Sequence, residues 1–202
     1  MLRNYEYILA SLPVITSGTR SGVPFEQIVS EIRENLSGKD LECFELLLEG
    51  FEGENLSAEF YLRAFASRSR FIREYFRFDL GVRNVRVGFL NRELGRPEAL
   101  DKVFPDPESP EEFEQQGAVL DVLSRTDILE RERGLDDLMW EKIESLTELE
   151  VLSLDQILGF TAKLQIIKRW LQLDPETGRA LFERLVSEIR NNKKPLSEAL
   201  QG

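Results

Sequence analysis

The chain has 202 residues, of which 42% are apolar and 31% charged, and its formal net charge is −11. This composition is typical of a soluble folded protein and excludes an intrinsically disordered chain. No apolar run approaches the ~20 residues of a membrane-spanning helix, so we expect a cytoplasmic protein without direct membrane insertion. With no histidine and one cysteine, Cys43, the sequence excludes the usual zinc clusters, His-dependent triads and internal disulfides. It also lacks the GxxxxGKS/T and GxGxxG phosphate-binding motifs, and we therefore expect neither a metal nor an organic cofactor.

The N-terminal part predicts one extended segment and two short helices. Residues 5–10 alternate aromatic and charged side chains, a pattern typical of a strand, which ends before Pro13. Pro24 suits the first turn of a helix that Gly38 ends, and residues 41–51 form a second amphipathic helix. The apolar positions of the two helices are Phe25, Ile28, Ile32 and Leu36, followed by Leu41, Phe44, Leu47, Leu48 and Phe51.

The stretch 57–95 predicts one long helix around which the chain is organised. Ser57 is a suitable N-cap, and Gly95 with Pro97 shortly after it marks the end. Apolar side chains in two rows indicate that the helix is covered on more than one side. Residues 63–97 contain nine arginines and three acids, a local balance of +6. Some acidic group must therefore lie against this helix. The two rows are Phe71, Tyr75, Phe78, Val82, Val85 and Phe89, and Ile72, Phe76, Leu80, Val87, Leu90 and Leu94.

Four prolines in residues 96–110 exclude a helix and predict the clearest loop of the chain. This loop is either a connector on the surface or a hinge between two halves. Loops of this length usually run over the surface, so we favour the connector and a single helical domain spanning residues 1–202.

Two acidic helices are predicted next, over residues 111–125 and 127–149. Residues 98–148 contain 16 acids and 5 bases, a balance of −11 that is opposite in sign to the +6 of the preceding helix. We expect the acidic helices to pack alongside that helix, with ion pairs at the rims of an apolar seam.

The C-terminal part is the most apolar. Ser153 and Gln156 form a capping box, and apolar side chains cover most of the helix that follows, which predicts a central position. Asp174 and Pro175 start a last helix, and the short link makes the two an antiparallel hairpin. The whole pattern predicts an all-α fold: an elongated antiparallel bundle of about seven helices with a short extended N-terminal segment.

Four polar residues are candidates for partner binding or for structural ion pairs: Arg83, Asn84, Arg86 and Lys163. The first three lie in the middle of the 57–95 helix, where an arginine presents a fixed fork to carboxylates of this chain or of an acidic partner. We favour an internal pair, because buried charges are usually paired, and the net charge disfavours nucleic acid as a partner. Lys163 lies in an apolar run, where it either pairs with an acid at the rim or is a buried lysine of lowered pKa; we favour the pair.

Four stretches of the sequence carry a resemblance to a known family. They are YEYILASLP at 5–13, FDLGVRNVR at 78–86, DDLMW at 136–140, and residues 157–186 with KLQIIKRW and LDPETG. The stretches resemble a bacterial family of uncharacterised proteins whose genes lie with those of vacuolar-type rotary ATPases. That family is similar to a reduced form of the subunit that joins the central stalk to the membrane ring, named C in archaea and d in eukaryotes. The resemblance implies bundles of helices and no catalytic residues.

The resemblance further implies a non-catalytic subunit or assembly factor of a vacuolar-type ATPase. Its partners would be stalk or ring-proximal subunits, and its location peripheral at the inner membrane through the ATPase. We expect an end or a side of the bundle to bind two neighbours, with the loop 96–110 as one contact. Two alternatives stay open: a free-standing adaptor whose acidic 98–148 face binds a basic partner, and an enzyme with a carboxylate or Mg²⁺ site. An inward-facing, unpaired cluster of Asp and Glu would favour the enzyme.

Overall fold

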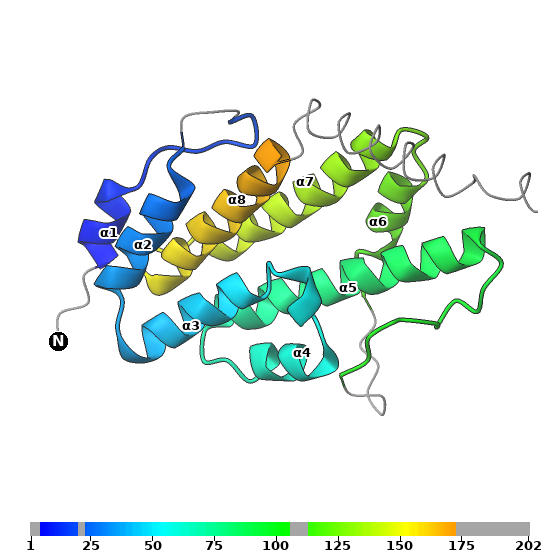
Figure 1. The fold of residues 1–202 in the computed structure, drawn as a ribbon, viewed down its shortest axis with the longest axis horizontal. Helices are drawn as coiled ribbons and strands as arrows, with labels where there is room; N and C mark the ends of the chain where they lie inside the picture. The colour runs from blue at the N-terminus through cyan, green and yellow to red at the C-terminus, as the bar shows by residue number, and fades with distance from the viewer. Residues whose placement is uncertain (1–4, 20–22, 106–112, 173–202) are drawn as a thin grey trace, which may run out of the picture.

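The computed structural model describes residues 5–19, 23–105 and 113–172. Within these ranges the fold is all-helical, which confirms the predicted class, and the helices form an elongated antiparallel bundle (Figure 1). The elements are α1 (Tyr5–Ser11), α2 (Phe25–Asn35), α3 (Gly38–Glu49), a short 3₁₀-helix η1 (Gly53–Asn55), α4 (Ala58–Phe65), α5 (Arg70–Glu93), α6 (Gln116–Leu123), α7 (Ile128–Thr147) and α8 (Leu154–Gln172).

Helices α5 and α8 are at the centre of the bundle. α5 contacts α4, α6, α7 and α8, and α8 contacts α1, α2, α3, α5 and α7. α7 runs antiparallel to both, because Glu132 near its start pairs with Arg86 in the second half of α5 and lies 3.7 Å from Arg169 near the end of α8. Figure 1 shows α7 and α8 side by side above α3, α4 and α5, with α1 and α2 at one end of the molecule.

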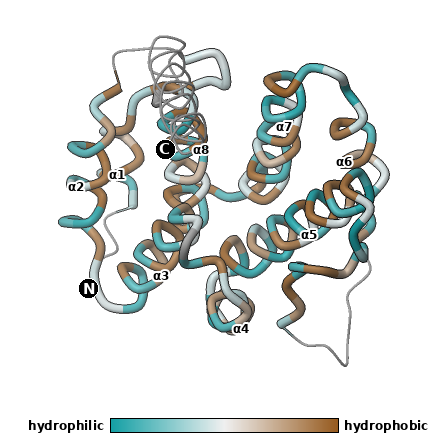
Figure 2. The backbone as a smooth tube through the Cα atoms, turned by 45° about the vertical axis from the view of Figure 1, so that its right-hand side comes forward, coloured by the Kyte–Doolittle hydropathy of each residue, from teal (hydrophilic) through white to brown (hydrophobic). Residues whose placement is uncertain are grey.

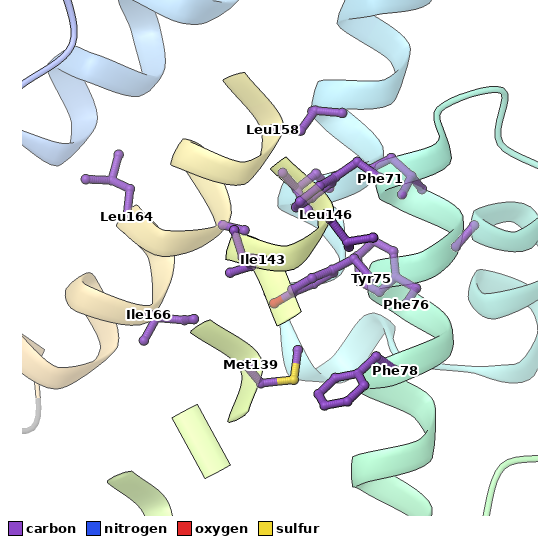
Figure 3. Close-up of a cluster of buried hydrophobic side chains, with 14 of the residues drawn as sticks. Phe71, Tyr75, Phe76, Phe78, Met139, Ile143, Leu146, Leu158, Leu164 and Ile166 are labelled. Carbon is purple, nitrogen blue, oxygen red and sulfur yellow. The ribbon is translucent and has the colours of Figure 1, made fainter. Parts of the chain in front are cut away.

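Apolar side chains of α5, α7 and α8 form much of the core. The rings of Phe71 and Tyr75 stack with their centroids 5.5 Å apart and an interplanar angle of 10°. Gly159 allows α8 to approach α7 closely, since a Cβ there would lie 2.6 Å from Cγ2 of Thr147. Apolar positions recur among polar ones along every helix, as amphipathic packing requires (Figure 2). Figure 3 shows a close-up of the core with the side chains of Phe71, Tyr75, Phe76, Phe78, Met139, Ile143, Leu146, Leu158, Leu164 and Ile166.

The predicted extended N-terminal segment is wrong, because residues 5–11 form helix α1. Tyr5 and Ile8 are both buried, and a helix places residues three apart on one face, whereas a strand would turn them to opposite sides. The Tyr5 hydroxyl also donates to Asp40 Oδ2 of α3 at 2.6 Å. Alternation over six residues is too short a pattern to outweigh this burial.

The single helix predicted over 57–95 is also wrong, because α4 ends at Phe65 and α5 begins at Arg70. Ser69 is the N-cap of α5: its Oγ accepts from the backbone N–H of Ile72 at 3.2 Å and donates to Asp155 Oδ1 at 2.8 Å. The second oxygen of Asp155 accepts from the backbone N–H of Phe71 at 3.3 Å. A carboxylate from α8 therefore completes the cap, which a local pattern does not reveal.

Several predicted helix ends are confirmed. Ser57 and Ser153 each accept a backbone N–H through Oγ at 3.2 Å, and Gly95 has a φ of +65° just beyond α5. Only a residue without Cβ adopts that conformation readily. The prediction that Gly38 ends a helix is wrong, since Gly38, with a φ of +54°, is the first residue of α3.

The acidic helices differ from their predictions in length. The first is confined to α6, and the second is α7, which Asp127 caps by accepting two backbone N–H groups. The helix predicted from Asp174 lies outside the described residues. None of the described helices combines the length and apolar character needed to cross a bilayer.

We predict that Asp155→Ala lowers the free energy of unfolding by about 1–3 kcal/mol, because Ser69 and the backbone N–H of Phe71 lose their shared acceptor. Asp155→Asn should lose less, since its amide oxygen still accepts one bond. Chemical denaturation of the two variants checks this. The control is Glu141→Ala on the exposed side of α7, and equal stability of Asp155→Ala and this control would contradict the prediction.

Candidate functional site

A cleft of about 790 Å³ opens between the N-terminal helices and the core helices. Residues of α2 and α3 line one wall, and residues of α5, α7 and α8 line the other. Tyr75 and Asp79 of α5, Asp136 of α7 and Arg169 of α8 bring polar groups to this second wall. Concave sites with a few polar groups on rigid helices are the usual form of a binding site, so the cleft is the candidate site.

Asp79 follows Tyr75 by one helical turn, so both lie on the same side of α5. The fully buried Tyr61 of α4 donates its hydroxyl to Asp79 Oδ2 at 2.7 Å. Burial raises the pKa of Asp79 from 3.8 to about 6, while the hydrogen bond from Tyr61 and the charge of Arg83 act in the opposite direction. Asp79 is thus a carboxylate with less solvation than its charge requires.

Asp136 is the more buried of the two aspartates of the cleft and is 9% exposed. Its Oδ2 accepts from the guanidinium of Arg169 and from the indole N–H of Trp170. Burial raises the pKa of Asp136, whereas the charge and hydrogen bond of Arg169 and the indole bond act to lower it. Arg169 therefore bridges Asp136 and Glu132, and fixes α8 to α7 beside the cleft.

Tyr75 brings a hydroxyl from a buried ring to the same wall. Its side chain is only 3% exposed, and its oxygen points from α5 toward α7 in the core close-up (Figure 3). In the described part of the chain this hydroxyl has no hydrogen-bond partner. Burial, with Asp79 and Asp136 nearby, raises the pKa of Tyr75 well above 10. The group is therefore a neutral phenol that can donate and accept a hydrogen bond.

The other cations that line the cleft are already engaged with acids. Nε of Arg33 lies 2.6 Å from Glu45, and Nζ of Lys168 lies 2.6 Å from Glu26. Within the described ranges, no three Asp, Glu or Cys side chains converge as ligands of a metal ion would. The arrangement can hold hydrogen-bonding or cationic groups, and it offers no set of paired acids for metal-assisted chemistry.

Arg83 and Arg86, two of the predicted candidates, do not line this cleft. Nη2 of Arg86 lies 2.5 Å from Glu132, in the seam between α5 and α7. Nε of Arg83 is buried and has no hydrogen-bond partner among the described residues. The charge of Arg83 acts on Asp79, whose pKa it lowers.

Lys163, the third candidate, lies at the α7–α8 contact. Its Nζ is 3.1 Å from Glu144 and 4.7 Å from the centroid of the Trp140 ring. The hydrogen bond from Lys163 lowers the pKa of Glu144, so this carboxylate is charged at neutral pH. This is the geometry of an ion pair and a cation–π contact at the rim of the bundle.

Asn84, the fourth candidate, holds the proline-rich loop against α5. Its Nδ2 donates to the carbonyl of Val103 at 2.8 Å, and the N–H of Val103 donates to Asn84 Oδ1 at 2.9 Å. Two helical turns further along α5, Asn91 donates to the carbonyl of Leu100 at 2.6 Å. Leu100 and Val103 of the loop are therefore held against α5 by hydrogen bonds.

The arginine-rich stretch finds carboxylates within the chain. Two of the acids that pair with its arginines, Glu98 and Glu132, belong to the acidic stretch 98–148 that the charge pattern indicated. Others come from α3 and from α5 itself. The pairs are Arg63 with Glu49, Arg68 with Asp40, Arg77 with Glu74, Arg86 with Glu132 and Arg92 with Glu98.

A family model described as "Protein of unknown function (DUF2764)" matches residues 53–193. The chain belongs to this family. The DUF2764 region contains α4 to α8, and therefore the wall of the cleft that carries Tyr75, Asp79 and Asp136. Helices α1 to α3, which supply the opposite wall, precede the matched region. Comparisons with curated proteins and with solved structures returned no match.

Sequence reasoning did not identify Tyr61, Tyr75, Asp79 or Asp136 as a site. A signal for Asp79 was present, because it is one of only three acids on an arginine-rich helix and lies one turn from the apolar-row residue Tyr75. Nothing in the sequence indicates that Asp136 faces the same cleft, because that depends on how α7 packs against α5.

We predict that Asp79→Asn raises the free energy of unfolding at pH 7.5 by about 1–3 kcal/mol. Since the folded pKa is about 6 and the ordinary value is 3.8, wild-type stability falls as pH rises from 3.8 to 6 and the loss is complete above that. The neutral amide avoids this loss and can still accept from Tyr61. Denaturation between pH 4 and 8 should show a gain that vanishes at the acid end, whereas a less stable variant at pH 7.5 would contradict the assignment.

We predict that Asn84→Ala loosens the loop without disturbing α5, because Val103 loses both of its backbone hydrogen bonds to the Asn84 amide. Hydrogen exchange followed by mass spectrometry should show faster exchange in residues 98–105 and little change in α5. Asn35→Ala is the control, since the Asn35 amide bonds only to the Glu31 carbonyl within α2. Unchanged exchange in the loop would show that another contact holds it.

Proposed function

We propose that this protein is a non-catalytic subunit or assembly factor of a bacterial vacuolar-type rotary ATPase, and that it connects two neighbouring components near the stalk and the membrane ring. The resemblance of four stretches to proteins encoded beside such ATPases supports the proposal. The all-helical architecture agrees with the helical bundles of the stalk connector. Under this proposal the protein is cytoplasmic and peripheral at the membrane.

Two groups of exposed apolar side chains at opposite ends of α7 carry the proposal. The start patch, Ile128 and Leu129, is 71% and 65% exposed. The turn patch comprises Leu149, Val151 and Leu152, of which Leu149 is 92% exposed. Because α7 has 20 residues, the two patches lie about 30 Å apart. Grouped exposed apolar residues are typical of protein contacts, and a connector needs two of them.

The start patch has neighbours on α5. Arg131 of α7 lies over the Phe89 ring, 5.8 Å from its centroid, so the end of α5 lies beside the start of α7. Leu90 and Leu94 at that end of α5 are also exposed. Leu100 and Phe104 of the adjoining loop are exposed as well, in agreement with a contact through this loop.

The turn patch has a different character. Glu148 and Glu150 flank its apolar residues, so a matching surface would be an apolar groove with basic residues at its edge. Leu152 has a φ of +49°, a left-handed conformation that costs free energy for a bulky side chain. Such strain at an exposed apolar turn is typical of a binding segment.

The enzyme alternative has less support. Both aspartates of the cleft accept hydrogen bonds from groups of this chain, Asp79 from Tyr61 and Asp136 from Arg169 and Trp170. They are therefore not the unpaired acid cluster that would favour hydrolysis or Mg²⁺ chemistry. The adaptor alternative differs from the proposal in its partner. A pull-down that identifies the bound proteins therefore separates the two.

The test is a pull-down of the tagged chain from native membranes, with mass spectrometry, together with ATP-driven ion transport in membrane vesicles. We expect Ile128→Ser/Leu129→Ser and Leu149→Ser/Val151→Ser each to lose a different ATPase component and to reduce coupled transport. Val14→Ser is the control, since Val14 is exposed but distant in sequence from both patches. If the wild-type chain recovers no ATPase subunit and gene deletion leaves transport unchanged, the proposal is wrong and the adaptor remains.

A further inference from the structure

We propose that the cleft between α2, α3 and the core helices is a binding site for an organic cation, an ammonium or guanidinium group held by the Asp79 carboxylate and the Tyr75 hydroxyl. This inference is independent of the ATPase proposal, because it concerns a different surface and a different ligand class. Such a group is present both in small amines and in Lys or Arg side chains of a partner protein.

The Tyr75 hydroxyl points to a ligand. The ring of Tyr75 is enclosed by the core, whereas its hydroxyl oxygen keeps contact with the cleft, where an incoming donor can reach it. Tyr75 is 3% exposed, it lines the cleft, and in the described part of the chain its hydroxyl is unpaired. A ligand N–H group in the cleft would supply the missing bond.

Asp79 supplies the charge on the same face of α5. Tyr61 donates to its Oδ2, so Oδ1 remains available to a ligand. No cation of the described residues lies within 4 Å of this carboxylate, although Arg83 acts on it from a greater distance. A bound ammonium would provide the pairing that burial of the carboxylate demands.

The rest of the lining favours a cation with an apolar stem. Arg33, Lys168 and Arg169 are each committed to an acid of this chain, so they do not offer a site for an anion. Phe51, whose ring centroid lies 6.0 Å from that of Tyr75, gives the cleft a second aromatic side chain. Aromatic faces attract ammonium groups, and the neighbouring apolar residues Leu48, Met139 and Ile166 suit an alkyl chain.

Calorimetric titration of the full chain at pH 7.5 tests the proposal with two probes. Butylammonium represents a free amine, and the capped peptide acetyl-Gly-Lys-Gly-amide represents a partner's side chain. We expect at least one probe to bind, and Asp79→Asn to weaken that binding about tenfold or more, because the charge-assisted bond is lost. Tyr75→Phe keeps the ring in the core and should weaken binding severalfold. Tighter binding of the peptide assigns the site to a protein partner, and tighter binding of butylammonium assigns it to a free amine.

The control is Asp137→Asn, which removes the same charge from an exposed position beside Asp136 that does not line the cleft. This variant should bind as the wild type does. Equal losses in Asp79→Asn and Asp137→Asn would mean non-specific attraction to an acidic protein and would overturn the proposal. Equal binding of neutral butanol, or no binding of either probe up to about 10 mM, would also overturn it. Circular dichroism of each variant verifies that it is folded.

Discussion

One carboxylate, that of Asp155, fixes how the two central helices meet. It lies in the first turn of α8, yet it accepts from Ser69 and from the backbone of Phe71 at the start of α5. A carboxylate stabilises a helix N-terminus, where N–H groups are unpaired and the helix dipole is positive, and here one side chain serves two such ends. It brings the start of α8 beside Phe71, where Gly159 leaves room for α7 to pack against α8. The positions of α5, α7 and α8, and hence one whole wall of the cleft, follow from this junction.

The cleft combines groups that reduce stability with helices that are otherwise well packed. Tyr61, Tyr75 and Asp79 lie within a set of aromatic contacts, among them Phe71 on Tyr75 and Phe60 on Tyr61. An apolar residue in place of Asp79 would avoid the cost of a poorly solvated charge. Natural proteins accept such costs mainly where binding or catalysis requires the polar group. With Asp136 neutralised by Arg169, it is Asp79 that distinguishes the cleft from an ordinary gap between helices.

The sequence predicted what depends on local pattern and on charge. The caps at Ser57 and Ser153, the stop at Gly95, the all-helical class and an acid of residues 98–148 beside the arginine-rich helix all follow from spacing and sign. The sequence-based prediction failed where contacts between residues far apart in the chain determine the local structure. The break before Arg70 needs Asp155 from α8, and residues 5–11 are helical because Tyr5 and Ile8 are buried together on one face. The site was missed for the same reason, since Asp79 and Asp136 meet one cleft only through the packing of α7 on α5.

Helix α7 contributes residues to the cleft and carries an exposed patch at each end. Its buried side contributes Met139 and Asp136 to the cleft, and its two ends carry the start patch and the turn patch. Arg169 fixes the position of α7, because it holds Asp136 and Glu132 of α7 to α8 at once. A cation bound at Asp79 and Tyr75 would add a charge beside this bridge. The cleft and the two patches thus share one helix, whose position beside α8 depends on the Arg169 bridge.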